Sequence, residues 1–213
     1  MIYKFLVSGL FLLLFLTVQQ SYSQTLFMGS ESIGIGLQYG YIGIGDVTTS
    51  SFALGFSKDR RADIGFIYTR GTTELPYQRE PHTYDMGAIF GTLFPASEWD
   101  GDPFTGELMI GAGINEDKRL NGPFLLTGIG ISKSLNDQPD KPGIRPRASL
   151  AYTLVAGKRS EDESNQVASS ISVSFELIFQ LTGKSGGVLI IPSYVFIPDA
   201  RTGGLGISAS III

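Results

Sequence analysis

Apolar and polar residues alternate one by one along most of this chain. The longest example runs from Val167 to Leu181, where every second residue from Ile171 onward is apolar and nearly all the residues between are small or polar. Successive side chains of a β-strand point to opposite faces of the sheet, so this pattern predicts a strand with one apolar face. A helix would need apolar residues three and four positions apart. The segment also exceeds the usual strand length of about five or six residues. A long apolar face needs a large apolar environment, which in a membrane is the lipid.

Nine further segments are predicted to be strands, most of them with the same alternation, while 188–197 is apolar on both faces. They are residues 32–41, 51–57, 63–69, 83–93, 104–114, 124–132, 147–157, 188–197 and 205–213. The stretches between them are polar or rich in Gly and Pro and too short to hold crossover helices, which favours antiparallel pairing. We therefore predict about ten strands; eight or twelve would follow if one hairpin were split or missed. In 124–132 the apolar residues Leu126 and Ile129 are an odd number of positions apart, so a regular strand would point them to opposite faces; a β-bulge would bring them to the same face. In 188–197, Pro192 is unfavourable inside a strand.

One face of nearly every segment is apolar, and the other carries Gly, Ser or Thr. In 83–93 we assign the even-numbered residues Tyr84, Met86, Ala88 and Phe90 to the apolar face and Asp85 to the other. No Lys, Arg, Asp or Glu falls on a position assigned to an apolar face. A soluble β-sandwich would cover its wet face with Lys, Glu and Arg. The small, nearly uncharged face found here is typical of the crowded lumen of a narrow barrel.

Residues Met1–Ser23 have the features of a secretory signal peptide. The early cation Lys4 precedes an apolar core, Phe5–Val18, and small residues just before Gln24 form a cleavage site. This core is shorter than the roughly 20 residues that a transmembrane helix requires. An uncleaved N-terminal anchor is the alternative. We expect residues 24–213 to form one domain. The chain has no Cys, which excludes a lipoprotein anchor, disulfides and thiolate metal sites.

With these features the chain resembles the small outer-membrane β-barrel proteins of Gram-negative bacteria. The resemblance covers the whole of 24–213 and consists of the signal peptide, the even strand count, the alternation and the lack of Cys. It implies an all-β fold, an antiparallel up-and-down transmembrane β-barrel located in the bacterial outer membrane. Many such proteins end in an aromatic residue, whereas this sequence ends in Ile211-Ile212-Ile213.

A barrel in a membrane must close, because unpaired backbone groups at a sheet edge cannot be satisfied in hydrocarbon. An even number of strands places both termini on the periplasmic side. The expected extracellular loops are then 46–50, 71–81, 115–123, 158–166 and 198–204. Aromatic residues near strand ends are candidates for the girdles at the two membrane interfaces. They are Tyr39, Tyr41, Tyr68, Tyr84, Trp99, Phe104, Tyr152, Tyr194 and Phe196.

A set of charged residues is assigned to the inner face: Asp63, Asp85, Glu107, Arg147 and Glu176. Ionised groups in a narrow lumen must pair or contact water. They predict a polar network that holds the shape of the barrel. The alternative is a narrow, cation-preferring conduit, because the acids outnumber the single base. A barrel of about eight to ten strands is mostly filled by side chains, which argues against a wide pore.

No catalytic, metal or cofactor site is predicted, and we expect the chain not to be an enzyme. The only histidine, His82, has the opposite parity to Asp85. Gly183-Lys184-Ser185 lacks the Gly that a phosphate loop needs five residues earlier. Asp100-Gly101-Asp102 and Glu161-Asp162-Glu163 lack the spacing of a calcium loop. The net charge of −4 gives no basic surface for nucleic acid.

Three functions fit these expectations. The first is an outer-membrane barrel, surrounded by lipid, with a structural or surface-interaction role carried by loops that contact a surface ligand. The second is a narrow cation-preferring channel. The third is a soluble lipocalin-like barrel whose apolar residues face inward and bind a hydrophobic ligand. The sequence favours the first and leaves the oligomeric state open.

Overall fold

The computed structural model describes residues 33–58, 61–73, 82–117, 121–136, 142–158, 165–181, 187–198 and 201–213. The predicted signal peptide, Met1–Ser23, lies outside these ranges, as do Glu161-Asp162-Glu163 and Gly183-Lys184-Ser185. Ten strands and one short 3-10 helix follow one another within them. Their bounds are β1 (Ile33–Ile44), β2 (Val47–Lys58), β3 (Ala62–Thr73), β4 (His82–Ala96), η1 (Glu98–Asp100), β5 (Thr105–Glu116), β6 (Gly122–Ser132), β7 (Gly143–Lys158), β8 (Asn165–Gln180), β9 (Gly187–Ile197) and β10 (Thr202–Ile212).

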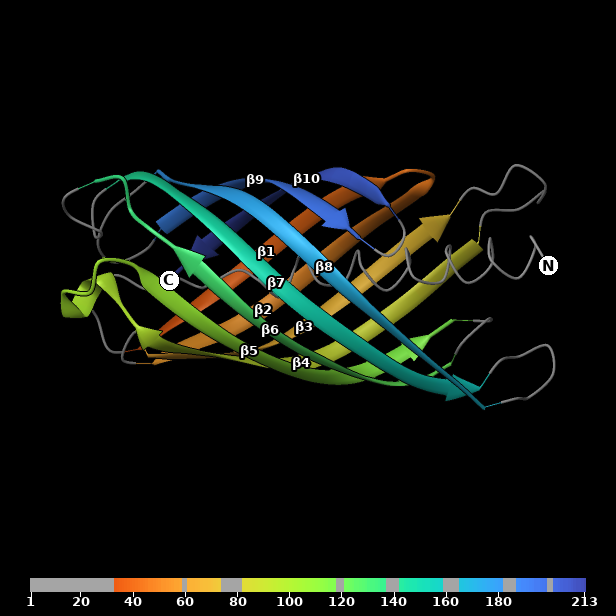
Figure 1. The fold of residues 1–213 in the computed structure, drawn as a ribbon. Coiled ribbons are helices and arrows are strands. Elements are labelled where there is room, and N and C mark those ends of the chain that lie inside the picture. Colours follow the sequence, from red (N-terminus) through yellow and green to blue (C-terminus); the bar gives the residue numbers. More distant parts are fainter. Residues whose placement is uncertain are drawn as a thin grey trace.

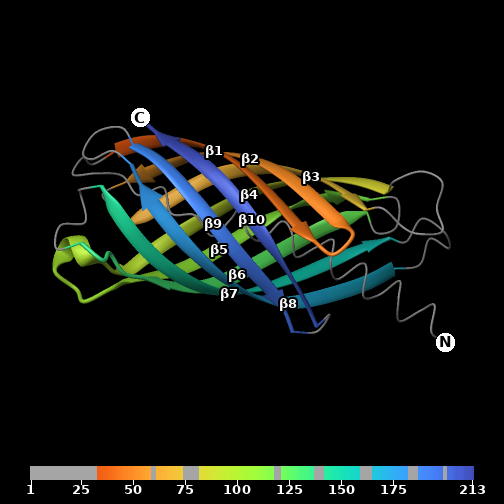
Figure 2. The ribbon, with the colours of Figure 1, turned by 90° about the horizontal axis from the view of Figure 1, so that it is seen from above.

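The strands form a closed barrel in which each strand is antiparallel to its neighbours in the chain (Figure 1). The first and last strands complete the ring, with Leu37 opposite Ile211 in the β1–β10 ladder. The views in Figures 1 and 2 show these two strands side by side. Backbone hydrogen bonds of 3.0 and 2.8 Å between Ile35 and Ile213 extend this ladder to the last residue. The prediction of an all-β, antiparallel up-and-down barrel of about ten strands is confirmed.

The barrel has two distinct ends. Ile33 and Ile213 lie at one of them, which we call the terminal end, together with the last residues of β2, β4, β6 and β8. The last residues of β1, β3, β5, β7 and β9 lie at the opposite end. Most of the residues predicted to form extracellular loops after β3, β5, β7 and β9 lie in 74–81, 118–120, 159–164 and 199–200, outside the described ranges.

Several strands extend further than the alternation predicted. Ile44 pairs with Val47, so β1 and β2 are joined by a turn of only Gly45 and Asp46, and the expected loop 46–50 is mostly strand. Gly45 has a φ of 56°, the left-handed conformation that tight hairpin turns require and glycine adopts at little cost. Gly, Ser and Thr at the other strand ends carry no apolar alternation, which explains why these ends were missed.

The predicted bulge in 124–132 is wrong. The register of β6 runs without a shift against both β5 and β7. Phe124 and Leu126 are buried inside the barrel, whereas Ile129 is 55% exposed on its outer surface, so both faces of this strand carry large apolar residues. A register shift lies instead between Leu93 and Ala96, where β4 pairs with β5.

Pro192 lies inside β9, within the segment that the sequence predicted to be a strand although proline is unfavourable there. It is opposite Ile207 in the β9–β10 ladder. On the other side, the β8–β9 ladder stops at the pair Glu176–Ser193 and resumes at Phe179–Ile190. Proline has no backbone N–H to donate, which explains the interruption beside it.

The outer surface of the barrel is apolar on every side. Large hydrophobic side chains are exposed on each strand, including Leu37, Phe52, Ile64, Ile89, Ile110, Leu125, Leu150, Phe175, Tyr194 and Ile207. Such a continuous exposed apolar surface is far larger than the patches of a few hundred Å² that soluble monomers carry.

The described strand side chains include charged residues on the outer face, which corrects the expectation that this face carries none. They are Arg70, Asp85, Glu116 and Lys158. Each lies within the last four residues of its strand at the opposite end. The rest of the described outer face is uncharged.

The predicted facing of β4 is also wrong. Tyr84, Met86, Ala88 and Phe90 point into the barrel and are at most 5% exposed, and they form a hydrophobic cluster with side chains of β2, β3, β6 and β7. Ile89 and its neighbours of the same parity face outward. Both faces of β4 are apolar, so alternation within this strand does not decide which one lies inside.

Glycines on β3 explain why the aromatic face of β4 turns inward. Gly65 and Gly71 are the register partners of Phe90 and Tyr84. A Cβ at Gly65 would lie 2.6 Å from Cζ of Phe90 and 2.7 Å from the Leu54 carbonyl oxygen, so the ring occupies the space that a side chain would need. The interior accommodates each ring because its partner has no side chain.

Replacing Gly65 with alanine should therefore destabilise the barrel. We expect the free energy of unfolding to fall by about 1–3 kcal/mol, the usual cost of overpacking an interior. Gly43→Ala is the matched control, because a Cβ at Gly43 would have no atom within 4 Å. Urea unfolding followed by circular dichroism measures both. Equal midpoints for the two variants would contradict this account of β4.

Candidate functional site

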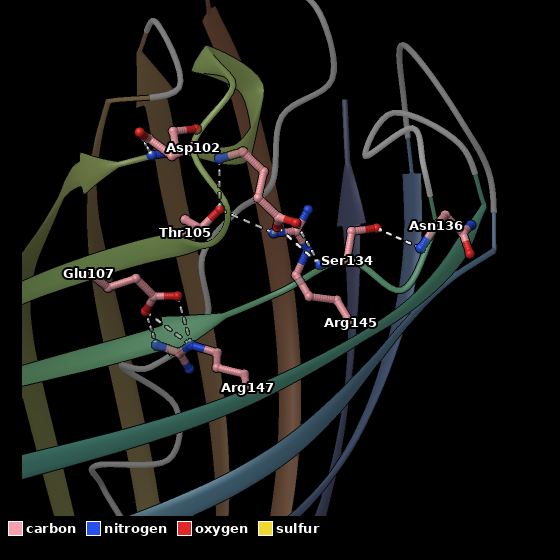
Figure 3. Close-up of polar contacts among 9 residues, drawn as sticks. Asp102, Thr105, Glu107, Ser134, Asn136, Arg145 and Arg147 are labelled. Carbon is pink, nitrogen blue, oxygen red and sulfur yellow. Dashed lines mark hydrogen bonds and ion pairs between the residues drawn. The ribbon is translucent and has the colours of Figure 1, made fainter.

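Three charged side chains meet in the barrel interior near the terminal end, and Figure 3 shows two of them. The Nε–H of Arg147 donates to both carboxylate oxygens of Glu107, at 2.9 and 3.0 Å, and Nη2 donates to the same carboxylate. Nη1 donates to Oε2 of Glu176 at 3.0 Å. All three side chains are at most 1% exposed. We call these residues the Arg147 cluster.

Strand register brings the Arg147 cluster together. Arg147 and Glu176 are direct partners in the β7–β8 ladder. Glu107 lies on β5, two strands from β7, and reaches across β6 at its register partner Gly130. A Cβ at Gly130 would lie 2.8 Å from Oε2 of Glu107. The missing side chain at Gly130 therefore leaves the path along which Glu107 reaches the guanidinium.

A second ion pair lies beside the cluster, closer to the terminal end (Figure 3). Nη1 of Arg145 is 2.7 Å from Oε2 of Glu98 and 3.3 Å from Oγ1 of Thr105. The Arg145 and Glu98 side chains are 7% and 11% exposed. Arg145 and Arg147 are two residues apart on one strand, so both point inward.

Glu98 also fixes the chain around η1. Its two carboxylate oxygens accept hydrogen bonds of 3.1 and 3.0 Å from the backbone N–H of Ser134, just beyond β6. Its own N–H donates to Oγ1 of Thr105 at 3.4 Å. The N–H of Ser97 donates to Oδ2 of Asp102 at 2.8 Å. These bonds tie η1 to β5, β7 and the end of β6.

Because its side chains are buried, the Arg147 cluster links strands through the interior and does not line a water-filled lumen. A buried charge without a partner costs several kcal/mol, so each carboxylate depends on the guanidinium. Nη2 of Arg147 also donates to Sδ of Met109 at 3.8 Å, which gives the guanidinium a further contact on β5. Farther from the terminal end, Ser149 and Ser174 share a hydrogen bond of 2.5 Å across the same pair of strands. The cluster thus joins β5, β7 and β8 through the interior.

The structure brings together three of the five residues assigned to a lumen network: Glu107, Arg147 and Glu176. Asp63 also faces the interior and is 4% exposed, but it lies on β3, which borders none of the three strands. The assignment of Asp85 to the lumen is wrong. Asp85 faces outward and forms an ion pair of 2.8 Å with Arg70, because the inward face of β4 is the one with Tyr84 and Phe90.

The aromatic residues assigned to girdles have mixed positions. Seven of them have side chains that are 38–58% exposed: Tyr39, Tyr41, Tyr68, Phe104, Tyr152, Tyr194 and Phe196. Tyr39 is opposite Phe52, and Phe52 is opposite Tyr68, so these rings form a row across β1–β3. Tyr84 was wrongly assigned, since it is 1% exposed in the interior. Trp99 belongs to η1, and its side chain lies outside what the structure describes.

Sequence reasoning missed Glu98 and Arg145. Both were placed in connections, because Pro95 and Pro146 ended the neighbouring alternation. Pro146 is nevertheless inside β7, opposite Leu177. The sequence signal that could have identified Arg145 is its spacing, because a residue two positions before Arg147 on the same strand points to the same face.

The described residues were also compared with the requirements of metal sites and membrane-spanning helices. No group of three or more His, Asp or Glu side chains with the arrangement of a metal site occurs among them. His82 is the first residue of β4, and its side chain is not described. None of the helical residues in the described ranges forms a helix long and apolar enough to cross a membrane.

Comparisons with known proteins give structural neighbours only. No family model matches the chain, and no curated protein matches it. The N-terminal β-barrel domain of Pseudomonas aeruginosa OprF has a TM-score of 0.36 and 7% identity, covering 84% of this chain and 97% of that one. The translocator domain of the autotransporter NalP from Neisseria meningitidis has a TM-score of 0.48 and 11% identity, covering 92% and 91%. Both likenesses concern the fold alone.

Arg147→Met tests whether the cluster crosslinks the barrel. Both carboxylates would remain buried without the Arg147 guanidinium, and we expect the free energy of unfolding to fall by about 3–5 kcal/mol. The triple variant Arg147→Met, Glu107→Gln, Glu176→Gln removes those charges and should recover most of the loss. Arg61→Met, which removes an ion pair at the surface, should leave the midpoint of urea unfolding nearly unchanged. A triple variant no more stable than Arg147→Met would contradict the crosslink.

Proposed function

We propose that this protein is a non-enzymatic barrel embedded in the bacterial outer membrane, with a closed lumen and a structural or surface-interaction role. The single observation that carries the proposal is the apolar outer surface, which is continuous over every strand and, among the described strand side chains, carries charge at one end only. In water such a surface would drive association. In lipid it is the surface that a transmembrane barrel requires.

Closure of the barrel supports the same location. Lipid offers no hydrogen bonds to exposed backbone groups, so a sheet can span it only when its first and last strands pair. The β1–β10 ladder meets that requirement. The outward-facing Arg70, Asp85, Glu116 and Lys158 would lie at the level of the headgroups, where their charges meet water.

The interior does not favour the alternative of a cation-preferring channel. A conduit would need a solvated path past Glu107 and Glu176, but both carboxylates are paired with Arg147 and at most 1% exposed. Farther along the lumen, Tyr84 and Phe90 are packed into a hydrophobic cluster. We therefore assign the inner side chains to holding the barrel in shape.

The alternative of a lipocalin-like barrel requires the opposite arrangement. Such a soluble barrel would turn its polar face to water and its apolar face to a ligand. Here Ile64, Ile110 and Ile207 are 55–60% exposed on the outside, while Glu107 and Arg147 are buried inside. The outer face therefore supports a lipid environment.

Loops are the part of the protein that would act at the cell surface. We infer that the end with the outward charges faces the outside, because both termini then lie on the periplasmic side. The connections that follow β1, β3, β5, β7 and β9 would be the ones exposed to a surface ligand. Such loops can vary in sequence without disturbing the barrel, which makes them suited to recognition.

Fractionation and gel mobility test the proposal together. We expect the protein in the outer-membrane fraction, migrating at one position when unheated in detergent and at another after boiling, since closed barrels resist detergent until heated. The matched variant Ile110→Lys places a charge on the lipid-facing surface and should cost about 2–4 kcal/mol if that position lies near the bilayer midplane. A soluble periplasmic product that tolerates Ile110→Lys would overturn the proposal.

A further inference from the structure

The β7–β8 hairpin extends further than the neighbouring β9–β10 hairpin at the opposite end of the barrel (Figures 1 and 2). The β7–β8 ladder runs out to the pair Lys158–Asn165, whereas the β8–β9 ladder begins only at Val173–Phe196. Among the described residues, no strand pairs with residues 165–170 on the side of β9. We call this side of residues 165–170 the β8 edge. The closed barrel thus keeps an open strand edge at the end that we turn to the outside.

The hydrogen bonds of the adjoining strands show which backbone groups lie on the β8 edge. Lys158 and Asn121 exchange backbone hydrogen bonds of 3.0 and 3.1 Å, so the N–H and C=O of Lys158 point away from β8. Opposed residues of an antiparallel ladder either bond to each other or both point away from each other. Asn165, the register partner of Lys158, therefore directs its N–H and C=O to the β8 edge.

The same direction recurs at every second residue of the strand. Val167 and Ser169 accordingly direct their N–H and C=O groups to the β8 edge. The far end of β8 agrees with this assignment, because the N–H of Leu181 donates to the Val188 carbonyl oxygen at 2.9 Å, on the side of β9. Asn165, Val167 and Ser169 thus hold a row of backbone donors and acceptors for which the described residues provide no partner. Such a row is a template for another strand.

Residues 165–170 lack the features that usually block the addition of a strand. Exposed edges in natural proteins are protected by charged side chains, prolines or bulges. The sequence here is Asn-Gln-Val-Ala-Ser-Ser, and its register against β7 has no shift. Unpaired backbone groups are not tolerated in hydrocarbon, so this part of β8 belongs in water, beyond the lipid-facing surface. The β8 edge is therefore accessible from outside the membrane.

Side chains beside the β8 edge indicate the chemistry of a strand that would fit it. Val167 is 71% exposed on the outer face, so an apolar side chain opposite it would gain a contact. Lys158 faces outward beside Asn165, one strand away from the β8 edge. Glu107 reaches Arg147 across one intervening strand, so a long acidic side chain opposite Asn165 can likewise reach Lys158.

We propose that the β8 edge binds an extended segment of another protein at the cell surface, which adds to the sheet as a strand antiparallel to β8. The segment carries an apolar side chain opposite Val167 and an acidic side chain opposite Asn165. Its backbone pairs with the N–H and C=O groups of the β8 edge. The inference rests on the proposed function, and it assigns the surface-interaction role to the backbone of one strand in addition to the loops.

A second copy in the same membrane does not fit the β8 edge. Strands of membrane barrels are tilted by about 35–45°, so two copies related by a two-fold axis along the membrane normal would present β8 strands that cross at about 70–90°. Hydrogen-bonded neighbours in a sheet are rotated by only about 20–25°. An extended segment of a different chain has no such restriction and can align with β8.

Amide hydrogen exchange measured by NMR tests the β8 edge in protein extracted from the outer membrane into detergent micelles. In the free protein we expect rapid exchange at Val167 and Ser169, and protection at Gln166 and Ala168, whose N–H groups bond to β7. The probe is the acetylated and amidated peptide Thr-Ile-Thr-Ile-Thr-Glu-Thr, which places isoleucines opposite Ser169 and Val167 and glutamate opposite Asn165. At saturation it should slow exchange at Val167 and Ser169 about tenfold or more.

Matched peptides and variants separate backbone pairing from other modes of binding. N-methylation of the two isoleucines removes N–H groups that would face β8 and should weaken binding about tenfold or more, whereas N-methylation of the two threonines that follow them should have little effect. Ser169→Pro removes an N–H from the β8 edge and should weaken binding in the same way. Ser169→Ala keeps that N–H and should bind like the wild type.

The assignment of an acidic residue has its own test. Lys158→Glu should weaken binding of the glutamate peptide several-fold and favour a peptide with lysine at the same position. An unchanged preference in Lys158→Glu would overturn the acidic residue.

Protection of Val167 and Ser169 in the free protein at every concentration would overturn the open edge. Failure of the unmodified peptide to protect them, or equal binding of the two N-methylated peptides, would overturn strand addition. Protection that rises with protein concentration in the absence of peptide would identify a second copy as the occupant and also overturn it. Fractionation and the heat-dependent shift in mobility are measured first. A wild type that fails them refutes the membrane location, whereas one that passes them without peptide binding refutes only the β8 edge.

Discussion

The pairing of β1 with β10 is the constraint on which the rest of this structure depends. It gives the backbone groups at both edges of the sheet a partner and leaves the chain with only two surfaces, an inside and an outside. Residue parity then decides the surroundings of every strand side chain, because a shift of one residue in register would exchange the two faces of a strand. The apolar outer surface and the buried ion pairs both follow from this single closed ladder.

Small residues on one strand make room for large ones on the next throughout the barrel. Gly65 and Gly71 receive the rings of Phe90 and Tyr84, and Gly130 leaves space for Glu107 to reach Arg147. At these positions the described strand side chains fill the interior. Gly87, on the outer surface, differs from these positions, because a Cβ there would lie no closer than 3.7 Å to the Phe66 ring.

Alternation predicted the strands whose two faces differ in chemistry. On β8 the inner face carries serines and Glu176 while the outer face carries Phe175 and Leu177, so the facing was readable from the sequence. On β4 and β6 both faces carry large apolar residues. On β4 the choice between them depends on glycines in the neighbouring strand β3. That information belongs to a pair of strands, and no single segment contains it.

The candidate site was predictable in part for the same reason. Glu107, Arg147 and Glu176 lie in segments with clear alternation, and their inward facing followed from parity. Arg145 and Glu98 lie beside prolines that ended the alternation, although Pro146 is accommodated within β7. Which acid meets which base depends on the registers of β5, β6, β7 and β8, and these are set by pairing along the whole barrel.

Site-directed spin labelling along β5 tests the central claim, a lipid-facing outer surface, most directly. The native chain has no Cys, so Leu108→Cys, Met109→Cys and Ile110→Cys each provide one labelling site. Leu108 and Ile110 are 47% and 60% exposed, and Met109 is 6% exposed. In lipid vesicles we expect labels at 108 and 110 to be relaxed by oxygen and protected from a water-soluble nickel chelate, with position 109 protected from both. Strong relaxation by the nickel chelate at 108 and 110 would place the outer surface in water and contradict the account.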